Sequence, residues 1–386
     1  MKLVVQVKLL PDSGQVAALE DTLRTANYAA CRLSERAQAN PRRCGRTALQ
    51  RDHYRDVKAL GLSAQPALHV IRKVADAYTL RSANLRAGNY GPASGDRYRR
   101  VAERPIRFRP NAAQPFDDRC LSWQHDAGTV SIWTTRGRLK DLRFTGSPDQ
   151  LKTLQLYRQG ESDLVYRDGM WFLYATCDIP EGEPIDPQGW VGVDLGIVNI
   201  ATTSGGYRAA GRGLNRHRGQ KRRLRTKLQA KGTKSAKRVL KRQRRKETRR
   251  ATDINHVISK SIVVEAQRTG HGIGLEDLTG IRERARLRKP QRTTLHSWAF
   301  AQLGTFIEYK ARQRGVPVVF VDPHDTSRMC SACRYVDKNN RVSQAKFRCR
   351  SCGVVAHADV NASHNIAAEA AVVWERGAES TAPAPA

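Results

Sequence analysis

The stretch HADVNASHNIA, residues 357–367, contains a single acid, Asp359, among small residues, amide side chains and two histidines. It follows four cysteines and opens a segment with helical spacing. A helix that only packs against a core has no use for so many polar groups in its first turn. We therefore expect Asp359 to meet partners that come from other parts of the chain.

Two cysteine pairs directly precede this stretch. Cys330-x-x-Cys333 and Cys349-x-x-Cys352 are separated by 15 residues, and this is the spacing of a zinc ribbon with four cysteine ligands. Four sulfur ligands leave no open position on the ion, so we expect a structural Zn²⁺ and not a catalytic one. The other four cysteines are scattered and we find no secretory segment, so a disulfide framework is not favoured.

Two further acids end apolar segments. Asp194 follows WVGV and Glu276 follows GIGL. A carboxylate in a segment that otherwise favours burial is costly unless it is paired or hydrogen-bonded. Oxygen ligands suit Mg²⁺, and a cluster of acids can hold two ions roughly 4 Å apart for phosphodiester hydrolysis. Taken singly, Asp194 can equally be a simple strand-end or cap residue, and Asp-x-Gly also occurs in phosphate-binding turns. Glu276 alone favours an exposed strand end, and Asp359 alone favours a helix N-cap. Only the set of three acids favours a metal site.

The charge balance predicts a polyanionic partner. Lys and Arg number 68 against 36 Asp and Glu, a formal net charge of +32. Such an excess strains a compact fold unless a polyanion neutralises it, and nucleic acid is the obvious candidate. An anionic membrane surface is the alternative, but no long apolar span is present and a membrane role is not favoured.

Much of this excess lies in residues 211–250, which contain 19 Lys or Arg and one acid, Glu247. A solvated charged helix is the usual explanation of such a run. Here acids do not interleave, so pairing within a helix cannot be its purpose, and contact with phosphates is the better interpretation. The residues expected to contact a nucleic-acid backbone are Lys221, Arg222, Arg223, Arg225, Lys241, Arg242, Arg244 and Arg245.

Periodicity predicts three regions. Residues 2–10 alternate like a strand, and residues 15–86 have helical spacing. Residues 105–178, from PIRFRP to a hairpin at Arg167-Asp168-Gly169, favour a small antiparallel barrel or sandwich, which the N-terminal strand could open. From residue 190 onward, strands and helices alternate in an α/β pattern, including a helix over 298–315. The Ala/Pro-rich end is predicted to be disordered.

The motifs together resemble a known family. GVDLGIVNIATTSGG, GIGLEDLTGI and the segment 325–367 are similar to the three RuvC motifs and the zinc ribbon of TnpB, a family of transposon-encoded, RNA-guided DNA endonucleases related to miniature type V CRISPR effectors. The resemblance covers about residues 191–367, and the N-terminal half is similar only in layout. It implies that Asp194, Glu276 and Asp359 are the catalytic acids and hold two Mg²⁺ ions. Arg334 stands where the first zinc knuckle usually has glycine.

The resemblance also implies a multidomain α+β architecture. An RNase H-like (RuvC) α/β nuclease core is expected over 184–325 and 356–372, with a zinc-ribbon insertion over 326–355. A wedge β-barrel is expected over 1–11 and 103–183, a helical recognition domain over 12–102, and a disordered tail over 373–386. The implied partners are a guide RNA and a double-stranded target DNA beside a short recognition motif. The expected location is the bacterial-type cytoplasm.

Three other functions stay open at this point. An RNA-guided DNA-binding repressor would lack cleavage, which the three intact acids argue against. A guide-free nuclease or transposase would act without bound RNA. A CRISPR-associated type V effector would share the chemistry and differ in the origin of its guide.

Overall fold

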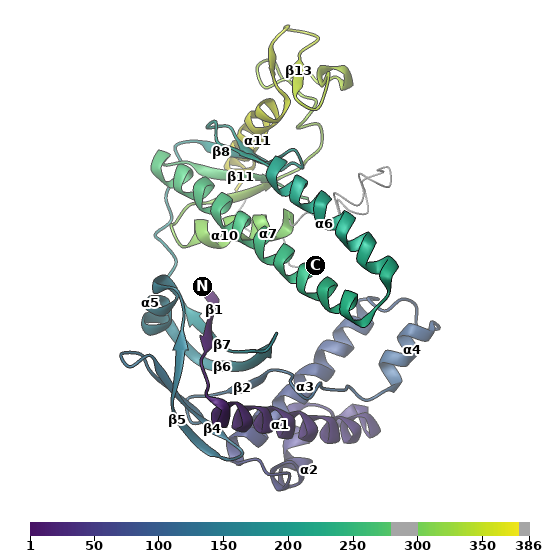
Figure 1. The fold of residues 1–386 in the computed structure, drawn as a ribbon. Coiled ribbons are helices and arrows are strands. Elements are labelled where there is room, and N and C mark those ends of the chain that lie inside the picture. The colour runs from purple at the N-terminus through teal and green to yellow at the C-terminus, as the bar shows by residue number, and fades with distance from the viewer. Residues whose placement is uncertain (279–299, 378–386) are drawn as a thin grey trace. The chain divides into compact units, whose positions relative to one another are not determined.

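The computed structural model describes residues 1–278 and 300–377, and the chain divides into two compact units, Met1–Ile179 and Pro180–Ala386 (Figure 1). The last three residues of GIGLEDLTGI, 279–281, the first two of the expected helix 298–315, and the tail from 378 lie outside the described residues. No helix within the described ranges combines the length and hydropathy needed to cross a bilayer.

The first unit contains a seven-stranded antiparallel sheet, with its strands in the order β2-β6-β7-β1-β5-β4-β3. The central strand β1 (Lys2–Leu9) pairs with β7 (Met170–Asp178) along its whole length and with β5 (Gly137–Thr145) at one end. The N-terminal strand therefore belongs to the sheet built by residues 114–178, as the alternation predicted. The other strands are β2 (Gln114–Phe116), β3 (Leu121–Gln124), β4 (Thr129–Thr134) and β6 (Arg158–Arg167).

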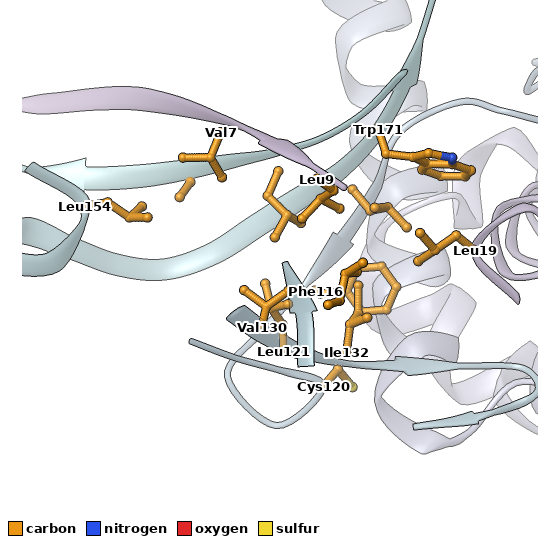
Figure 2. Close-up of a cluster of buried hydrophobic side chains, with 14 of the residues drawn as sticks. Val7, Leu9, Leu19, Phe116, Cys120, Leu121, Val130, Ile132, Leu154 and Trp171 are labelled. Carbon is orange, nitrogen blue, oxygen red and sulfur yellow. The ribbon is translucent and has the colours of Figure 1, made fainter. Parts of the chain in front are cut away.

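Alternating residues of β1 make the core of this sheet. Val7 and Leu9 are buried in the same apolar cluster as Phe116 and Trp171 from other strands (Figure 2). Leu19, from the first helix, closes the same cluster. The β6–β7 hairpin turns at Asp168-Gly169 with φ of 63° and 80°, the left-handed pair that a two-residue hairpin requires and that Asp-Gly accommodates. The predicted hairpin is confirmed.

The helical block lies between β1 and β2 in the chain. It consists of α1 (Ser13–Ala39), a 3-10 turn η1 (Pro41–Arg43), α2 (Arg46–Ala59), α3 (Ala64–Arg86) and α4 (Asp96–Glu103). A capping box between Asp12 and Gln15 starts α1. The small residues Ala26 and Ala30 of α1 pack against Val70 and Val74 of α3, so the two helices approach closely.

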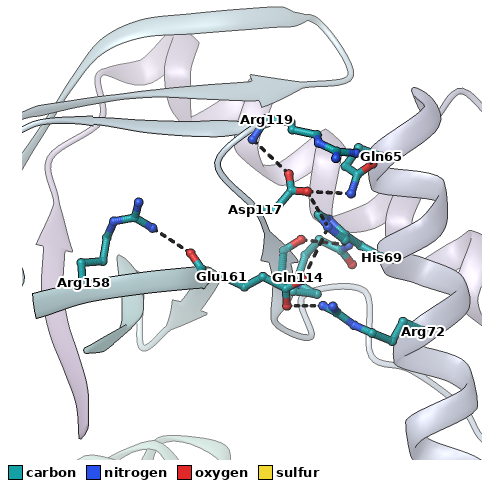
Figure 3. A network of polar contacts seen from close by, with 10 residues as sticks. Gln65, His69, Arg72, Gln114, Asp117, Arg119, Arg158 and Glu161 are labelled. Carbon is teal, nitrogen blue, oxygen red and sulfur yellow. Dashed lines mark hydrogen bonds and ion pairs between the residues drawn. The ribbon is translucent and has the colours of Figure 1, made fainter. Parts of the chain in front are cut away.

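A polar network joins α3 to the sheet of the same unit (Figure 3). Gln65 donates to Asp117 over 2.6 Å, and Arg72 pairs with Glu161. Between them the buried His69 lies 3.7 Å from Asp117 and 3.8 Å from Glu161. Burial lowers the pKa of His69, although both carboxylates oppose that shift. The helical block is therefore held to the sheet by polar contacts as well as by apolar packing.

Two expectations for local structure were wrong, and one helix was not predicted. PIRFRP is not a strand: a proline stands at each end of it, and the side chain of Cys31 accepts the backbone N–H of Phe108, so that N–H does not need a sheet partner. Residues 148–157 form a helix, α5 (Pro148–Tyr157), which starts with a capping box from Ser147. Residues 373–375 continue the last helix and do not belong to a disordered tail.

The second unit has a mixed five-stranded sheet in the order β10-β9-β8-β11-β12. Strands β8 (Trp190–Asp194), β11 (Gly272–Glu276) and β12 (Val318–Val321) are parallel, and β9 (Asn199–Thr203) and β10 (Arg208–Ala210) continue the sheet antiparallel to β8 and to each other. The helices are α6 (Arg212–Lys231), α7 (Lys234–Thr269), α10 (Phe300–Arg312) and α11 (Ala358–Glu375). The alternating α/β pattern expected after residue 190 is confirmed.

A small cysteine-rich insertion separates β12 from α11 in this unit (Figure 1). Its regular structure is a 3-10 turn, η2 (Lys338–Asn340), and a two-stranded sheet of β13 (Lys346–Arg348) and β14 (Val355–His357). Asn340 is fully buried within the insertion and donates to the backbone oxygens of Arg328 and Tyr335.

Candidate active site

The two faces of the second sheet are packed by different helices. Val191 and Val193 of β8 and Ile273 and Leu275 of β11 are buried in one cluster with residues of α7 and α10. The alternate positions, which include Gly192 and Gly274, face α11. Because side chains alternate along a strand, Asp194 and Glu276 share the α11 face.

Asp194 and Glu276 also lie side by side along the sheet. Leu275 is the register partner of Val193 across the parallel pair, so the next residue of each strand is one of the two acids. Both acids are the last residues of their strands. The carboxyl ends of parallel strands are where α/β sheets hold their ligands.

Helix α11 approaches this face so closely that only glycine fits beneath it. A Cβ on Gly192 would lie 2.0 Å from the carbonyl oxygen of Ser363, and a Cβ on Gly274 would lie 2.7 Å from the Cβ of Ala370. Ala362 and Ser363 are themselves buried. The small residues that surround Asp359 in the sequence therefore allow α11 to pack closely on the sheet.

Asp359 lies in the first turn of α11, yet it does not cap that helix. The cap is His357, whose Nδ1 accepts the backbone N–H of Asp359 over 3.2 Å. The buried carboxylate of Asp359 instead accepts from Asn199 Nδ2 at 2.8 Å and from Arg341 at 3.3 Å. Its partners therefore come from β9 and from the cysteine-rich insertion.

Asn361 and Asn365 fasten the insertion to α11. Asn361 donates to the carbonyl of Met329 over 2.7 Å and accepts from the backbone of Ser331 over 2.9 Å. Asn365 donates to the carbonyls of Thr326 and Met329 at 2.9 and 2.7 Å. Both amides are buried. They hold the base of the insertion beside the acids.

The electrostatics of this place favour a cation. Burial, together with the charges of Glu276 and Asp359, raises the pKa of Asp194 to about 8 against the opposing charge of Arg341. Burial likewise raises the pKa of Glu276, although a hydrogen bond from Thr326 at 2.5 Å and the charge of Arg341 counteract it. Three carboxylates thus share one guanidinium, and their full ionisation calls for further positive charge.

Arg341 was not singled out in the sequence. It lies between the two cysteine pairs and reaches back from the insertion to Asp359, with a side chain that is 27% exposed. Its only sequence signal was its position in a cysteine-rich segment next to a candidate acid, and many arginines of this basic chain would share such a signal.

The three carboxylates form a looser set than the four thiols. Among the described residues, Cys330, Cys333, Cys349 and Cys352 are the group whose potential ligand atoms all lie within 4.8 Å of one another. The structure brings Asp194, Glu276 and Asp359 to one place but does not close them into such a cluster.

The thiol cluster has the dimensions of a tetrahedral zinc site. Cys330 Sγ lies 3.7 Å from Cys352 Sγ, and Cys333 Sγ lies 3.6 Å from Cys349 Sγ. Zn–S bonds of about 2.3 Å in a tetrahedron separate the sulfurs by about 3.8 Å. Backbone N–H groups of Ser351 and Cys352 point at Cys349 Sγ, each over 3.4 Å, and such donors favour the thiolate. These four residues fit Zn²⁺.

Arg334 makes the turn of the first knuckle without glycine. Its φ is 60°, and the corresponding Gly353 of the second knuckle has φ of 74°. Left-handed backbone is costly for a residue with a side chain. The Arg334 guanidinium contacts Asn365 and Glu369 of α11 at 3.4 and 3.9 Å, and these contacts offset part of that cost.

The basic run forms a helical hairpin of α6 and α7. Lys221 donates to Gln243 over 2.7 Å and Arg225 pairs with Glu247 over 3.2 Å, so these two cations hold the hairpin together. Four other predicted contact residues, Arg222, Arg223, Lys241 and Arg242, are exposed or half-exposed and make no ion pair within the described part of the chain. Arg244 is also exposed. The Arg245 side chain lies outside the described residues.

Several known proteins are similar to this chain. Residues 300–366 match the family model described as Cas12f1-like, TNB domain. The chain is 32% identical over 231 residues to the CRISPR-associated endodeoxyribonuclease Cas12f1 of Sulfoacidibacillus thermotolerans, covering 55% of this chain and 53% of that protein. It is 38% identical over 123 residues to a TnpB-like protein of Methanocaldococcus jannaschii, covering 31% of this chain and 43% of that protein. The chain thus spans about half the length of the curated relatives it matches. The resemblance to TnpB is confirmed.

The fold is similar to that of solved effectors. The cryo-EM structure of a Cas12f1–sgRNA–target DNA complex aligns with a TM-score of 0.57 at 14% identity, covering 90% of this chain and 82% of that chain. At this identity the likeness concerns the fold alone, and it supports an α+β architecture of the Cas12f kind.

Proposed function

We propose that this chain is an RNA-guided DNA endonuclease that hydrolyses phosphodiester bonds with Asp194, Glu276 and Asp359. The observation that carries the proposal is the convergence of these acids from β8, β11 and α11 beside Arg341. Packing alone gives no reason to gather three carboxylates in one buried place, whereas a site for divalent cations and phosphate does. Relatives named as endodeoxyribonucleases support the same reaction class.

The three acids would hold two Mg²⁺ ions, because carboxylate oxygens are the ligands that Mg²⁺ prefers. When bound, the ions would supply an activated water and stabilise charge on the transferred phosphate. Thr326 orients Glu276, and Asn199 orients Asp359. Arg341 has more donors than its contact with Asp359 uses, so it can also bind a phosphate oxygen that enters the site.

The domain layout follows from the same proposal. The mixed sheet and α11 would form the RNase H-like (RuvC) core, over 184–325 and 356–372, with the zinc ribbon inserted over 326–355. The pairing of β1 with β5 and β7 supports a single wedge domain from 1–11 and 103–183. The helices α1 to α4 support a recognition domain over 12–102.

A guide RNA and a double-stranded target DNA are the proposed partners. The unpaired cations of the α6–α7 hairpin support contact with a phosphate backbone. Changing Arg222, Arg223, Lys241 and Arg242 together to glutamine should lower the salt-dependence slope for single-stranded RNA by about 3. Arg225→Gln is the control, because its cation already pairs with Glu247. Equal slopes for the fourfold variant and wild type would remove the hairpin from the interface.

The decisive test is cleavage with the native guide. RNA that copurifies with the chain is sequenced, and a library of matching targets is incubated with the complex and Mg²⁺. Asp194→Asn should abolish cutting and keep guide-dependent binding, and Asp253→Asn, an exposed acid on α7, should cut normally. Wild-type binding without any cutting would favour the repressor, and cutting without RNA would favour the guide-free nuclease.

A further inference from the structure

A cavity of about 370 Å³ lies in the first unit, between the C-terminal half of α3, helix α4 and the segment that follows it. Leu80, Pro105 and Ile106 give it apolar lining, and Tyr90 gives it an aromatic ring. Its volume falls in the range of small-ligand sites, which are largely apolar with a few polar groups.

Two arginines add positive charge to this lining. The side chains of Arg100 and Arg104 are exposed and form neither an ion pair nor a hydrogen bond with any described residue. Arg99 on the same helix, by contrast, pairs with Asp96 over 2.6 Å. Arg100 and Arg104 are therefore available to an anion from outside.

The walls of the cavity are held in place. Arg81 donates to Gln38 Oε1 at 2.8 Å and to the carbonyl of Arg104 at 3.0 Å, which ties the segment after α4 to α1 and α3. The guanidinium of Arg97 lies 5.3 Å from the centre of the Tyr90 ring and fixes that ring. A cavity built in this way is formed before its ligand arrives.

We propose that this cavity receives one unstacked nucleotide of a bound single-stranded RNA. Its base would stack on Tyr90 against the apolar lining, and its phosphate would lie between Arg100 and Arg104. An aromatic ring beside unpaired cations is the arrangement that single-strand binders use. A free mononucleotide has the same chemistry, and the test separates the two sources. The inference rests on the proposed function in one respect, namely that RNA is a partner.

The test compares two oligomers of equal length and charge on the full chain. One is a 12-nucleotide oligo(A), and the other is an abasic ribose-phosphate chain. Tyr90→Ala should weaken the binding of oligo(A) about 10-fold, as the loss of one stacked base predicts, and leave the abasic chain unaffected. Tyr90→Phe should bind like wild type. Tyr98→Ala, on α4 but outside the cavity lining, is the matched control.

The arginines are tested with the same pair of oligomers. Arg100→Gln should weaken both oligomers by the same factor, since the phosphate is common to them, and Arg99→Gln should change neither beyond twofold. AMP should compete with oligo(A) for wild type but not for Tyr90→Ala. Micromolar AMP binding that leaves oligo(A) affinity unchanged would assign the cavity to free nucleotide and overturn the RNA assignment.

Failure here is distinguishable from failure of the proposed function. If wild type cuts guided targets in Mg²⁺ while Tyr90→Ala and Tyr98→Ala bind both oligomers alike, only the cavity assignment is lost. If the chain neither copurifies with RNA nor binds the oligomers, the proposed function fails with it.

Discussion

Replacing Gly192 with alanine tests whether the contact between β8 and α11 sets the geometry of the acids. The new Cβ would lie 2.0 Å from Ser363 O and 2.4 Å from Ala367 N. Both are backbone atoms, so no change of rotamer relieves the clash. To regain ordinary contact the helix must retreat by roughly 1 Å or more. We expect overpacking to cost about 1–3 kcal/mol of stability.

The larger effect should be on catalysis. Asp359 belongs to α11, whereas Asp194 and Glu276 belong to the sheet. A shift of the helix away from the sheet therefore increases the distance between Asp359 and the other two acids. A misplacement of about 1 Å can lower a rate about 100-fold. Guided cleavage rates should therefore fall about 100-fold while the binding of guide RNA is kept, measured in single-turnover assays beside urea denaturation.

Gly304→Ala is the matched control. Gly304 lies inside α10, and a Cβ there meets no atom within 4 Å. Alanine should stabilise that helix by roughly 0.5–1 kcal/mol and leave cleavage unchanged. A Gly192→Ala variant that cuts as fast as Gly304→Ala would refute the idea that this close contact positions Asp359.

Three further outcomes are expected. Arg341→Ala should lower cleavage at least 10-fold with little loss of DNA binding, and Arg341→Lys should restore part of the rate; equal rates for both variants and wild type would exclude a role in the site. Cys330→Ser should lower zinc content, measured by atomic absorption, and reduce the yield of folded protein; a full zinc complement would exclude Cys330 as a ligand. Burial lowers the pKa of Lys73 to about 8 in the folded state, from 10.5 in the unfolded chain. Below pH 8 the protonation of Lys73 therefore lowers the free energy of unfolding. This destabilisation disappears as the pH rises from 8 to 10.5. Between those limits wild type should gain about 3 kcal/mol of stability relative to Lys73→Met, and parallel pH profiles in urea denaturation would contradict this.

Sequence patterns predicted the elements that carry a clear period. Strands β8, β11 and β12 could be predicted from their apolar runs, and β1 from its alternation. Such patterns are informative because the burial of apolar residues is the dominant force in folding. PIRFRP misled because its composition resembles a strand, while its prolines and a cysteine partner determine its conformation. Helix α5 was missed, although Ser147 and Gln150 carry a capping-box signature.

The acids of the candidate site could be predicted from the sequence, but the residues around them could not. A carboxylate at the end of an apolar strand can be recognised from the sequence pattern alone. The sequence does not reveal that Gly192 lies under Ser363, or that Arg341 reaches Asp359, because both depend on how α11 and the insertion pack. The chemistry of the zinc ligands, by contrast, follows from local spacing alone.

The central position of β1 has a consequence for synthesis on the ribosome. Strand β1 must wait for both of its neighbours, β5 and β7, and the second of these ends at Asp178. The whole segment from Lys2 to Asp178 is therefore made before the sheet can close, and strands that pair across such long separations form slowly. During that interval the helices α1 to α3 can already form from local contacts, which gives the nascent chain a compact portion while β1 still lacks partners.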